Sequence, residues 1–452
     1  MSKETLQRSL TGRHIMLIAI GGAIGTGLFL GAGRSISLAG PSILLVYAII
    51  GCLLFFLMRA LGELLLSNTD FNSFADIARA YLGNWAGFFT GWTYWFCWVV
   101  TGMAEITAVA KYIGYWWPSI PQWLSALACA LLLLMINLLT VKAFGEFEFW
   151  FAVIKVTTIV VLIVIGAVMI IMGTKTPSGH VSLTHIWSHG GFFPNGAKGF
   201  ILAFQMAVFS FVGVELIGVT AGETKDPEKT LPKAINAIPI RILLFYIGTL
   251  IVIMSVTPWN KISAVDSPFV TLFAFVGIPA AATIINFVVI SAAASSCNSG
   301  LFSTSRMLYG LGKQGDASPK FAQLNSKGVP ALGLIFSAII LLFGVLLNYF
   351  LQADQVFTIV TSLATVLFVF VWAIITVSYI LYQRRDQVLA AKQTFKMPFS
   401  KVMPWILIVF FIFVLAVLCL DVETRIAIYV APIWFALLGL FYVLKQRHAH
   451  KQ

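Results

Sequence analysis

Residues 21–27 read Gly-Gly-Ala-Ile-Gly-Thr-Gly, and these four glycines lie inside an apolar run over about 14–34. Each glycine in a helix interior costs about 1 kcal/mol relative to alanine. A second apolar run, over about 198–219, contains Phe209-Ser210-Phe211-Val212-Gly213-Val214-Glu215, which places a glycine and an acid near its middle. The two stretches predict two interrupted helices.

The composition of the whole chain is that of a membrane protein. Of 452 residues, 60% are hydrophobic and 10% are charged, and the mean hydropathy is +0.94, whereas soluble domains carry about 25% charged residues. Lipid can cover an apolar surface that so few charges cannot. The composition therefore argues against a soluble enzyme, a nucleic-acid-binding module and a disordered scaffold.

Twelve apolar runs are long enough to cross a bilayer, since a spanning helix needs about 20 residues. The connections between them are short, so residues 1–452 are expected to form one all-α transmembrane domain. The runs lie at about 14–34, 41–62, 83–110, 120–140, 147–172, 198–219, 238–257, 280–305, 331–350, 356–382, 403–420 and 426–444.

The basic residues predict the orientation of these spans. If the N-terminus is cytoplasmic, 22 Lys and Arg fall on the cytoplasmic side, six on the other, and Lys155 lies inside a span. Cytoplasmic loops carry such an excess. We therefore expect both termini in the cytoplasm, and we attribute the net charge of +12 to these loops rather than to a nucleic-acid surface.

The two interrupted helices are spans 1 and 6, five spans apart. This pairing is typical of an inverted-repeat transporter, with one repeat over about 14–172, a second over about 198–382, and two further helices over about 403–444. An alternative for span 1 is that Gly21 and Gly25 only allow close helix packing.

Several further stretches accompany these glycines: Gly22-Ala23-Ile24-Gly25-Thr26-Gly27-Leu28-Phe29, Ala39-Gly40-Pro41-Ser42, Gly62-Glu63, Gly145-Glu146-Phe147-Glu148-Phe149-Trp150, Gly213-Val214-Glu215 and Glu223-Thr224-Lys225-Asp226-Pro227. With them the chain resembles the amino acid/polyamine/organocation superfamily, in its bacterial amino acid transporter branch. Through residues 89–104 it is most similar to the D-serine/D-alanine/glycine proton symporters.

The resemblance implies a leucine-transporter-type fold with broken helices 1 and 6 and two peripheral helices. It implies proton-coupled import of glycine, alanine or serine, including D-forms, across a bacterial inner membrane by alternating access, without a cofactor. A permease for proline, GABA or aromatic amino acids, an exchanger and a channel are the alternatives. No Walker, HExxH or GxSxG motif is present, which argues against a primary pump and an intramembrane enzyme.

The interrupted helices supply groups that fit an amino acid. Backbone N–H groups of Ile24, Gly25, Thr26 and Gly27 are expected to bind the carboxylate, because an unwound segment at a half-helix end attracts anions. The carbonyls near Phe209, Ser210 and Val212 are expected to accept from the ammonium, as the resemblance also implies. Phe204, Phe209 and Phe211 are the expected walls of the pocket.

Ionisable residues inside spans are candidates for function. Glu215 is expected to contact the ammonium or carry the coupled proton, with pinning of the helix break by backbone N–H groups as the alternative. Lys155 matches a lysine that, in some members of the superfamily, occupies the place of a coupling sodium ion, which implies a role in proton coupling. Snorkelling to the headgroups is its alternative.

Four further residues are candidates for the pocket or for gates. Glu105 lies either in the pocket or at the outer end of span 3 beside Lys111. Glu63 is expected to form a helix-surface ion pair with Arg59, four residues earlier, with a gate as the alternative. Glu223 belongs to a loop where the resemblance implies a gate or anchor, with a solvated loop charge as the alternative. Ser295 is expected to bond span 1 or surround Lys155, as are Ser291, Ser296 and Asn298 of the same span.

No metal site is expected. The five cysteines lie in apolar runs without a CxxC pair, and His180, His185 and His189 are loosely spaced in an outer loop.

Overall fold

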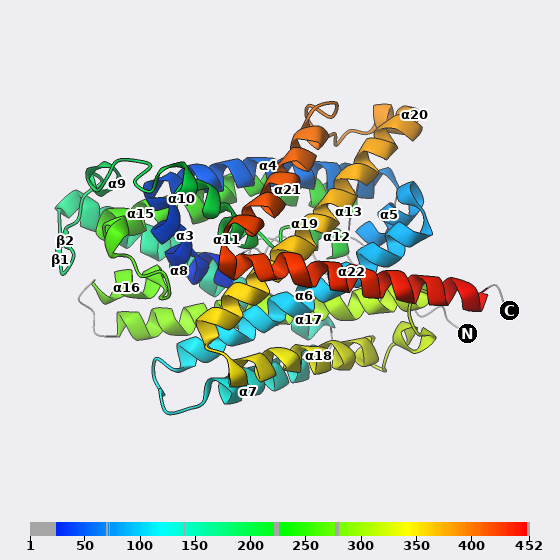
Figure 1. The fold of residues 1–452 in the computed structure, drawn as a ribbon, viewed down its shortest axis with the longest axis horizontal. Coiled ribbons are helices and arrows are strands. Elements are labelled where there is room, and N and C mark those ends of the chain that lie inside the picture. Colours follow the sequence, from blue (N-terminus) through cyan, green and yellow to red (C-terminus); the bar gives the residue numbers. More distant parts are fainter. Residues whose placement is uncertain are drawn as a thin grey trace.

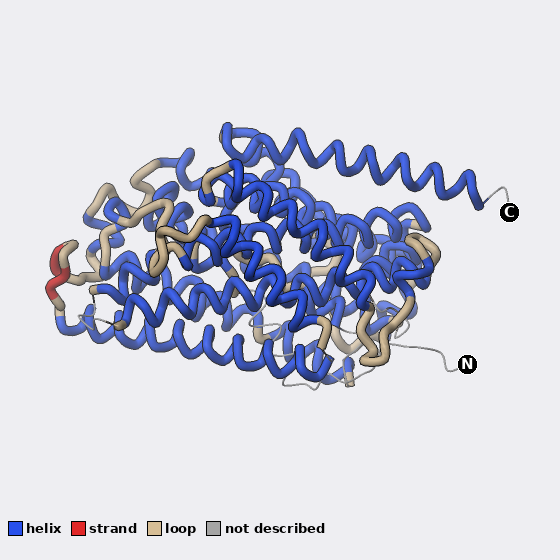
Figure 2. Tube along the Cα trace, turned by 90° about the horizontal axis from the view of Figure 1, so that it is seen from below, coloured by secondary structure: helices blue, strands red, loops and turns tan. Residues whose placement is uncertain are grey.

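The computed structural model describes residues 24–68, 71, 73–139, 141–220, 226–275 and 280–449, and these are almost entirely helical. Most of the long helices lie side by side along the longest axis of the molecule (Figures 1 and 2). The long helices are α4 (Ile43–Ser67), α6 (Asn84–Ile113), α7 (Gln122–Asn137), α8 (Val141–Met172), α17 (Ala281–Lys313), α18 (Ala331–Phe350), α19 (Ala353–Arg385), α21 (Met403–Leu420) and α22 (Val422–Ala449).

Short elements occupy the two ends of this bundle. At one end lie β1 (Lys175–Thr176), β2 (Gly179–His180), α9 (His185–Ser188) and α16 (Pro268–Ala274), and at the other lie α5 (Phe74–Leu82), α13 (Pro227–Asn236) and α20 (Gln387–Lys392) (Figure 1). The chain of α22 ends on the side of α5. Between α13 and α17 follow α14 (Ile238–Arg241), a π-helical segment (Ile242–Gly248) and α15 (Thr249–Val256).

Nine helical segments of the described chain are long and apolar enough to cross a membrane. Two shorter apolar helices, Gln122–Asn137 and Gly196–Phe209, lie where two further spans are predicted. About half of the first predicted span, residues 14–23 of about 14–34, lies outside the described residues. The helical membrane architecture is therefore confirmed, while the count of twelve spans and the inverted repeat remain predictions.

The helices differ in how far their neighbours cover them. In α6, 83% of the most apolar window is buried, against 17% in α22. Helix α6 packs most extensively against α17 and α19. Residues placed on α6, such as Glu105, therefore lie in the interior of the bundle, whereas α22 presents most of its surface to lipid.

The sixth predicted span is broken, as the sequence predicts. Helices α10 (Gly196–Leu202) and α11 (Phe204–Phe209) precede a non-helical turn over 210–215, and α12 (Leu216–Thr220) follows it. Gly213 has φ +104°, a conformation that favours glycine.

The described part of the first predicted span begins immediately before a helix. Gly25 is extended, with φ −118° and ψ −160°, and is followed by α2 (Thr26–Phe29) and α3 (Gly31–Ala39). Gly21, Gly22 and Ala23 lie outside the described residues. Whether this span is interrupted therefore stays a prediction.

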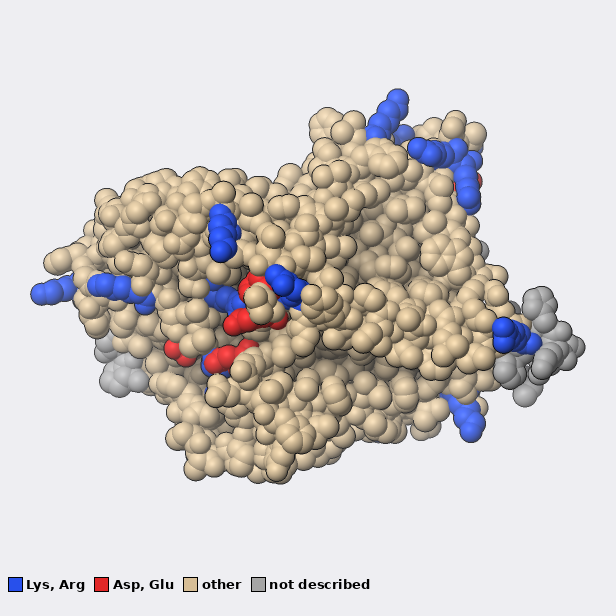
Figure 3. All heavy atoms as spheres, in the orientation of Figure 1, with Lys and Arg blue, Asp and Glu red and all other residues tan. Residues whose placement is uncertain are grey.

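Two groups of charged side chains tie the peripheral helix α22 to the bundle. Near its start, Arg34 of α3 pairs with Asp421 and Glu423 at 3.3 and 2.8 Å. On the face shown in Figure 3, acidic side chains gather beside basic ones, while most of the surface is uncharged. Near its end, Lys445 pairs with the buried side chain of Asp316, which also pairs with Arg79 of α5.

Candidate substrate site

A small cavity lies where α2 begins, beside the break of the sixth span. Its lining residues come from the start of α2, from α6, from the break and from α17, namely Gly25, Gly27, Thr101, Glu105, Phe209, Ser210, Val212 and Ser296. The structure thus brings together the two glycine-containing segments that the sequence singles out. Thr101 was not predicted to lie there, and Ser296 was predicted to bond span 1 or surround Lys155 rather than to line a cavity.

Two glycines allow this approach. A Cβ on Gly27 would lie 2.6 Å from the Cα of Ser210, and a Cβ on Gly25 would lie 2.9 Å from Oε1 of Glu105. Contacts this short leave no room for a methyl group. Gly27 therefore lets the start of α2 approach the break, and Gly25 lets it approach α6.

The start of α2 lies beside this cavity. The first amide N–H groups of a helix have no acceptor within it, and Gly25 and Gly27, which line the cavity, are the N-cap and the second residue of α2. Ile24 and Thr26 are buried next to Gly25, although neither is a lining residue. The hydroxyl of Thr26 makes no hydrogen bond within the described chain.

Glu105 faces the cavity, which is the first of its two predicted positions. Its side chain is 2% exposed, and among the described residues its Oε2 has no hydrogen-bond partner. Lys111, beside which the second position would lie, instead pairs with Asp354 at 2.6 Å. A buried carboxylate oxygen without a donor is costly, so it is a candidate for binding a cationic group.

Ser210 is fixed by two tyrosines from neighbouring segments. The hydroxyls of Tyr47 and Ser210 lie 3.0 Å apart, and Tyr246 donates to the carbonyl oxygen of Ser210 at 2.9 Å. A carbonyl oxygen can accept two hydrogen bonds, which leaves one acceptor site at Ser210.

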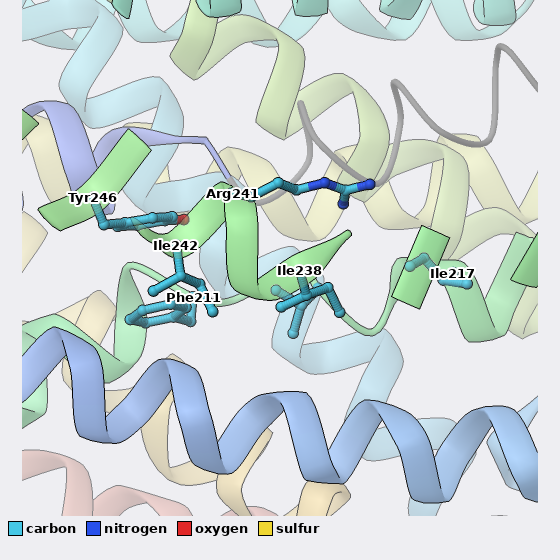
Figure 4. Close-up of a pocket in the computed structure, with 7 residues that line it drawn as sticks. Phe211, Ile217, Ile238, Arg241, Ile242 and Tyr246 are labelled. Carbon is cyan, nitrogen blue, oxygen red and sulfur yellow. The ribbon is translucent and has the colours of Figure 1, made fainter. Parts of the chain in front are cut away.

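Phe211 does not line this cavity. Its ring stacks on Tyr246, with centroids 4.6 Å apart, and it lines a second cavity together with Val214, Ile217, Ile238, Arg241 and Ile242 (Figure 4). Phe204 is also placed elsewhere, because its ring packs against Phe413 of α21. Of the three aromatic walls predicted, only Phe209 is in place.

The carboxylate of Glu215 turns back onto the break itself. It accepts from the amide N–H of Gly213 at 3.2 Å and from the Tyr94 hydroxyl at 3.5 Å, and the side chain is fully buried. Glu215 lines neither cavity described above. These are the contacts expected of the alternative interpretation, in which the carboxylate pins the helix break, and its role in proton coupling stays a prediction.

Lys155 is fully buried and points into the bundle. Its Nζ donates to the hydroxyl of Ser295 on α17 at 3.1 Å, so the snorkelling alternative is wrong. Ser295 therefore lies beside Lys155, which is one of the two positions predicted for Ser295. The Ser295 hydroxyl donates in turn to Oε2 of Glu148 at 2.9 Å. Glu148 was not predicted as a site residue, although it lies seven residues, or two helical turns, before Lys155.

Glu63 is buried, so the predicted helix-surface pair with Arg59 is wrong. Its carboxylate accepts from the Tyr379 hydroxyl at 2.7 Å, from Gln383 Nε2 at 2.9 Å and from the Met397 amide at 2.7 Å. The interaction joins α4 to α19 and to the segment before α21. Glu223, the remaining candidate, lies outside the described residues.

Comparisons with known proteins agree with this architecture. The family model described as amino acid permease matches residues 14–452. The chain is 56% identical to the D-serine/D-alanine/glycine transporter of Escherichia coli strain K12, over 99% of this chain and 96% of that protein. It is also similar to two Bacillus subtilis strain 168 proteins, the amino-acid permease AapA (54% identity, 99% and 97% covered) and the probable threonine/serine transporter YbxG (44%, 98% and 96%).

Proposed function

The chain belongs to the amino acid permease family and is an amino acid transporter, and we propose that it imports small neutral amino acids by proton symport. The proposed substrates are glycine, alanine and serine, including D-alanine and D-serine. Support for this choice comes from the 56% identity to a D-serine/D-alanine/glycine transporter over 99% of the chain.

The observation that carries the proposal is the cavity between the start of α2 and the break of the sixth span. A zwitterion needs donors for its carboxylate and acceptors for its ammonium, both in a site without bulk water. The cavity is lined by Gly25 and Gly27 at the start of α2, and by Glu105, whose Oε2 has no hydrogen-bond partner among the described residues. Phe209 and Ser296 also line it, which favours a short side chain on the substrate.

We assign the ionisable residues as follows. The substrate carboxylate binds the amides of residues 24–27, and its ammonium binds Glu105 and the carbonyls of Ser210 and Val212. Lys155 carries the charge that responds to the coupled proton. Glu215 holds the break in the conformation that exposes those carbonyls.

The proposed setting is a bacterial inner membrane, with both termini in the cytoplasm. The excess of basic residues in the loops expected on that side supports this orientation. In this orientation α8 begins at the cytoplasmic side, so Glu148 lies closer to the cytoplasm than Lys155. The proposed transporter needs no cofactor, because the proton gradient supplies the driving force.

Uptake in proteoliposomes tests the proposal. Purified protein is reconstituted, and uptake of radiolabelled glycine is measured while the pH gradient and the sodium concentration are varied independently, with unlabelled L- and D-amino acids as competitors. We expect accumulation that requires an inward proton gradient, ignores sodium, and is inhibited by glycine, D-alanine and D-serine. Sodium dependence, or no competition by glycine and D-alanine, would contradict the proposal.

A further inference from the structure

Three ionisable side chains share the interior between α6, α8 and α17. Lys155 interacts electrostatically with Glu148, on its own helix, and with Glu105 on α6, and all three residues are at most 2% exposed. Helix α17 faces them with the neutral side chains Ser295, Ser296 and Asn298, and α7 contributes Asn137. The cluster therefore contains one base between two acids, one of which lines the cavity.

The total charge of this cluster indicates how many protons it holds. With all three groups ionised, one ammonium and two carboxylates carry a net charge of −1. Burial disfavours net charge, so the cluster is expected to hold one additional proton. Either of two carboxylates can carry that proton, Glu105 on α6 beside the cavity or Glu148 on α8.

Ser295 links the ammonium to Glu148 in a geometry that passes a proton. Its oxygen accepts from Lys155 Nζ at 3.1 Å, while its own O–H donates to Glu148 Oε2 at 2.9 Å. A hydroxyl that accepts on one side and donates on the other can give up one proton while it takes another. This chain of hydrogen bonds leads from Lys155 through Ser295 to Glu148.

Glu148 is held in a fixed orientation by a second amide. Asn298 Nδ2 donates to its Oε1 at 2.7 Å, and the Oδ1 of Asn298 accepts from Asn137 Nδ2 at 2.6 Å. Four residues before Glu148, the ring of Phe144 stacks on Phe302 of α17 with centroids 3.9 Å apart, and the guanidinium of Arg306 covers Phe302. This aromatic pair stands between Glu148 and the start of α8.

We propose that Glu148 is the internal proton acceptor of the transporter, receiving the coupled proton from Lys155 through Ser295 and releasing it to the cytoplasm when the Phe144 and Phe302 pair separates. In this step an Nζ–H bond breaks and an O–H bond forms on Ser295, while the original Ser295 O–H bond breaks and an O–H bond forms on Glu148. Lys155 becomes a neutral amine and Glu148 a neutral acid. The inference rests on the proton coupling in the proposed function.

Glu148→Gln removes the acceptor and keeps the size of the side chain. Two assays are compared in proteoliposomes: accumulation of glycine driven by a pH gradient, and counterflow of labelled glycine against unlabelled glycine without a gradient. Counterflow requires binding and alternating access but no net proton release. We expect accumulation to fall about tenfold or more while counterflow stays within about twofold of the wild type.

Glu146→Gln is the matched control, because it makes the same change two residues earlier on the same helix, at a partly exposed position. It should leave both assays unchanged. Accumulation at the wild-type level by Glu148→Gln overturns the inference. An equal loss of accumulation and counterflow, in a variant that is folded and still stabilised by glycine, also overturns it, since that result indicates a merely structural role. If the wild type itself does not respond to the pH gradient, the proposed function fails first.

Ser295 gives a second test that does not depend on the folding of the Glu148 variant. Ser295→Ala removes the bridging hydroxyl, and we expect about tenfold slower accumulation with normal counterflow. Ser295→Thr keeps a hydroxyl and should restore most of the rate. Accumulation at the wild-type rate in Ser295→Ala overturns the link between Lys155 and Glu148.

Discussion

The break of the sixth span and the cluster of α6, α8 and α17 both bury acids in the membrane, but they satisfy them differently. Glu215 at the break receives donors from Gly213 and Tyr94 and lines no described cavity. In the cluster, Glu105 has an oxygen without a donor in the described chain, and Glu148 shares a serine with a lysine. An acid held by fixed donors shapes the backbone, whereas an acid with an open position can exchange ligands and protons.

Replacing Lys155 should give the largest loss of proton-driven accumulation. Lys155→Met removes the only base of the cluster, and accumulation driven by the pH gradient should fall by about tenfold or more, to the equilibrium level, because the proton then has no differential effect on the two access states. Counterflow should persist. Accumulation against a gradient, still driven by protons in this variant, would remove Lys155 from the mechanism.

Gly27→Ala tests the contact between the start of α2 and the break of the sixth span. The new Cβ would lie 2.6 Å from the Cα of Ser210, and because that neighbour is backbone, the helix start and the break must separate. Overpacking of this kind costs about 1–3 kcal/mol, and we expect uptake and counterflow to fall together. Gly439→Ala on α22 is the control, since a Cβ there meets no atom within 4 Å. Normal uptake by Gly27→Ala would show that the contact is not needed.

Glu215→Gln should have a smaller effect on transport. The amide oxygen of Gln can still accept from Gly213, so we expect uptake within about threefold of the wild type and a loss of about 1 kcal/mol in stability. Thermal unfolding in detergent and uptake are measured on the same preparation. A loss of proton-driven uptake with unchanged stability would instead place Glu215 in the coupling mechanism.

The smallest effect is expected where the charges face water. Arg34 pairs with Asp421 and Glu423, whose side chains are 27% and 64% exposed, and exposed ion pairs contribute about 0–1 kcal/mol. Arg34→Gln should leave uptake unchanged and shift thermal unfolding only slightly. Loss of uptake in this variant would mean that the pair controls access to the site rather than stabilising a surface.

The sequence predicts the parts of this site that depend on local backbone. Gly213 and Glu215 indicate the break of the sixth span, and five of the eight lining residues of the cavity were predicted from the two glycine-containing segments. These predictions succeed because a glycine or an acid destabilises a helix inside an apolar run, whatever the run packs against.

The residues that were missed depend on packing between distant segments. Thr101 lines the cavity because one face of α6 meets α2, and α6 is buried on most sides, so its sequence does not indicate that face. Ser296 belongs to the polar residues of α17, whose sequence indicates a contact with span 1 or Lys155 but not with the cavity. Glu63 was misassigned because Tyr379 and Met397, which bury it, follow 316 and 334 residues later. Glu148 was within reach, since an acid and a base two turns apart in one apolar helix share a face.

The buried pairings of Asp316 with Arg79 and Lys445 have a practical consequence for handling the protein. An affinity tag or fluorescent protein fused directly after residue 444 would delete Lys445 and leave the Asp316 carboxylate with one cation instead of two. The expected result is fraying of α22 from the bundle and a detergent-sensitive preparation. Fusions should therefore start beyond Ala449, where α22 ends.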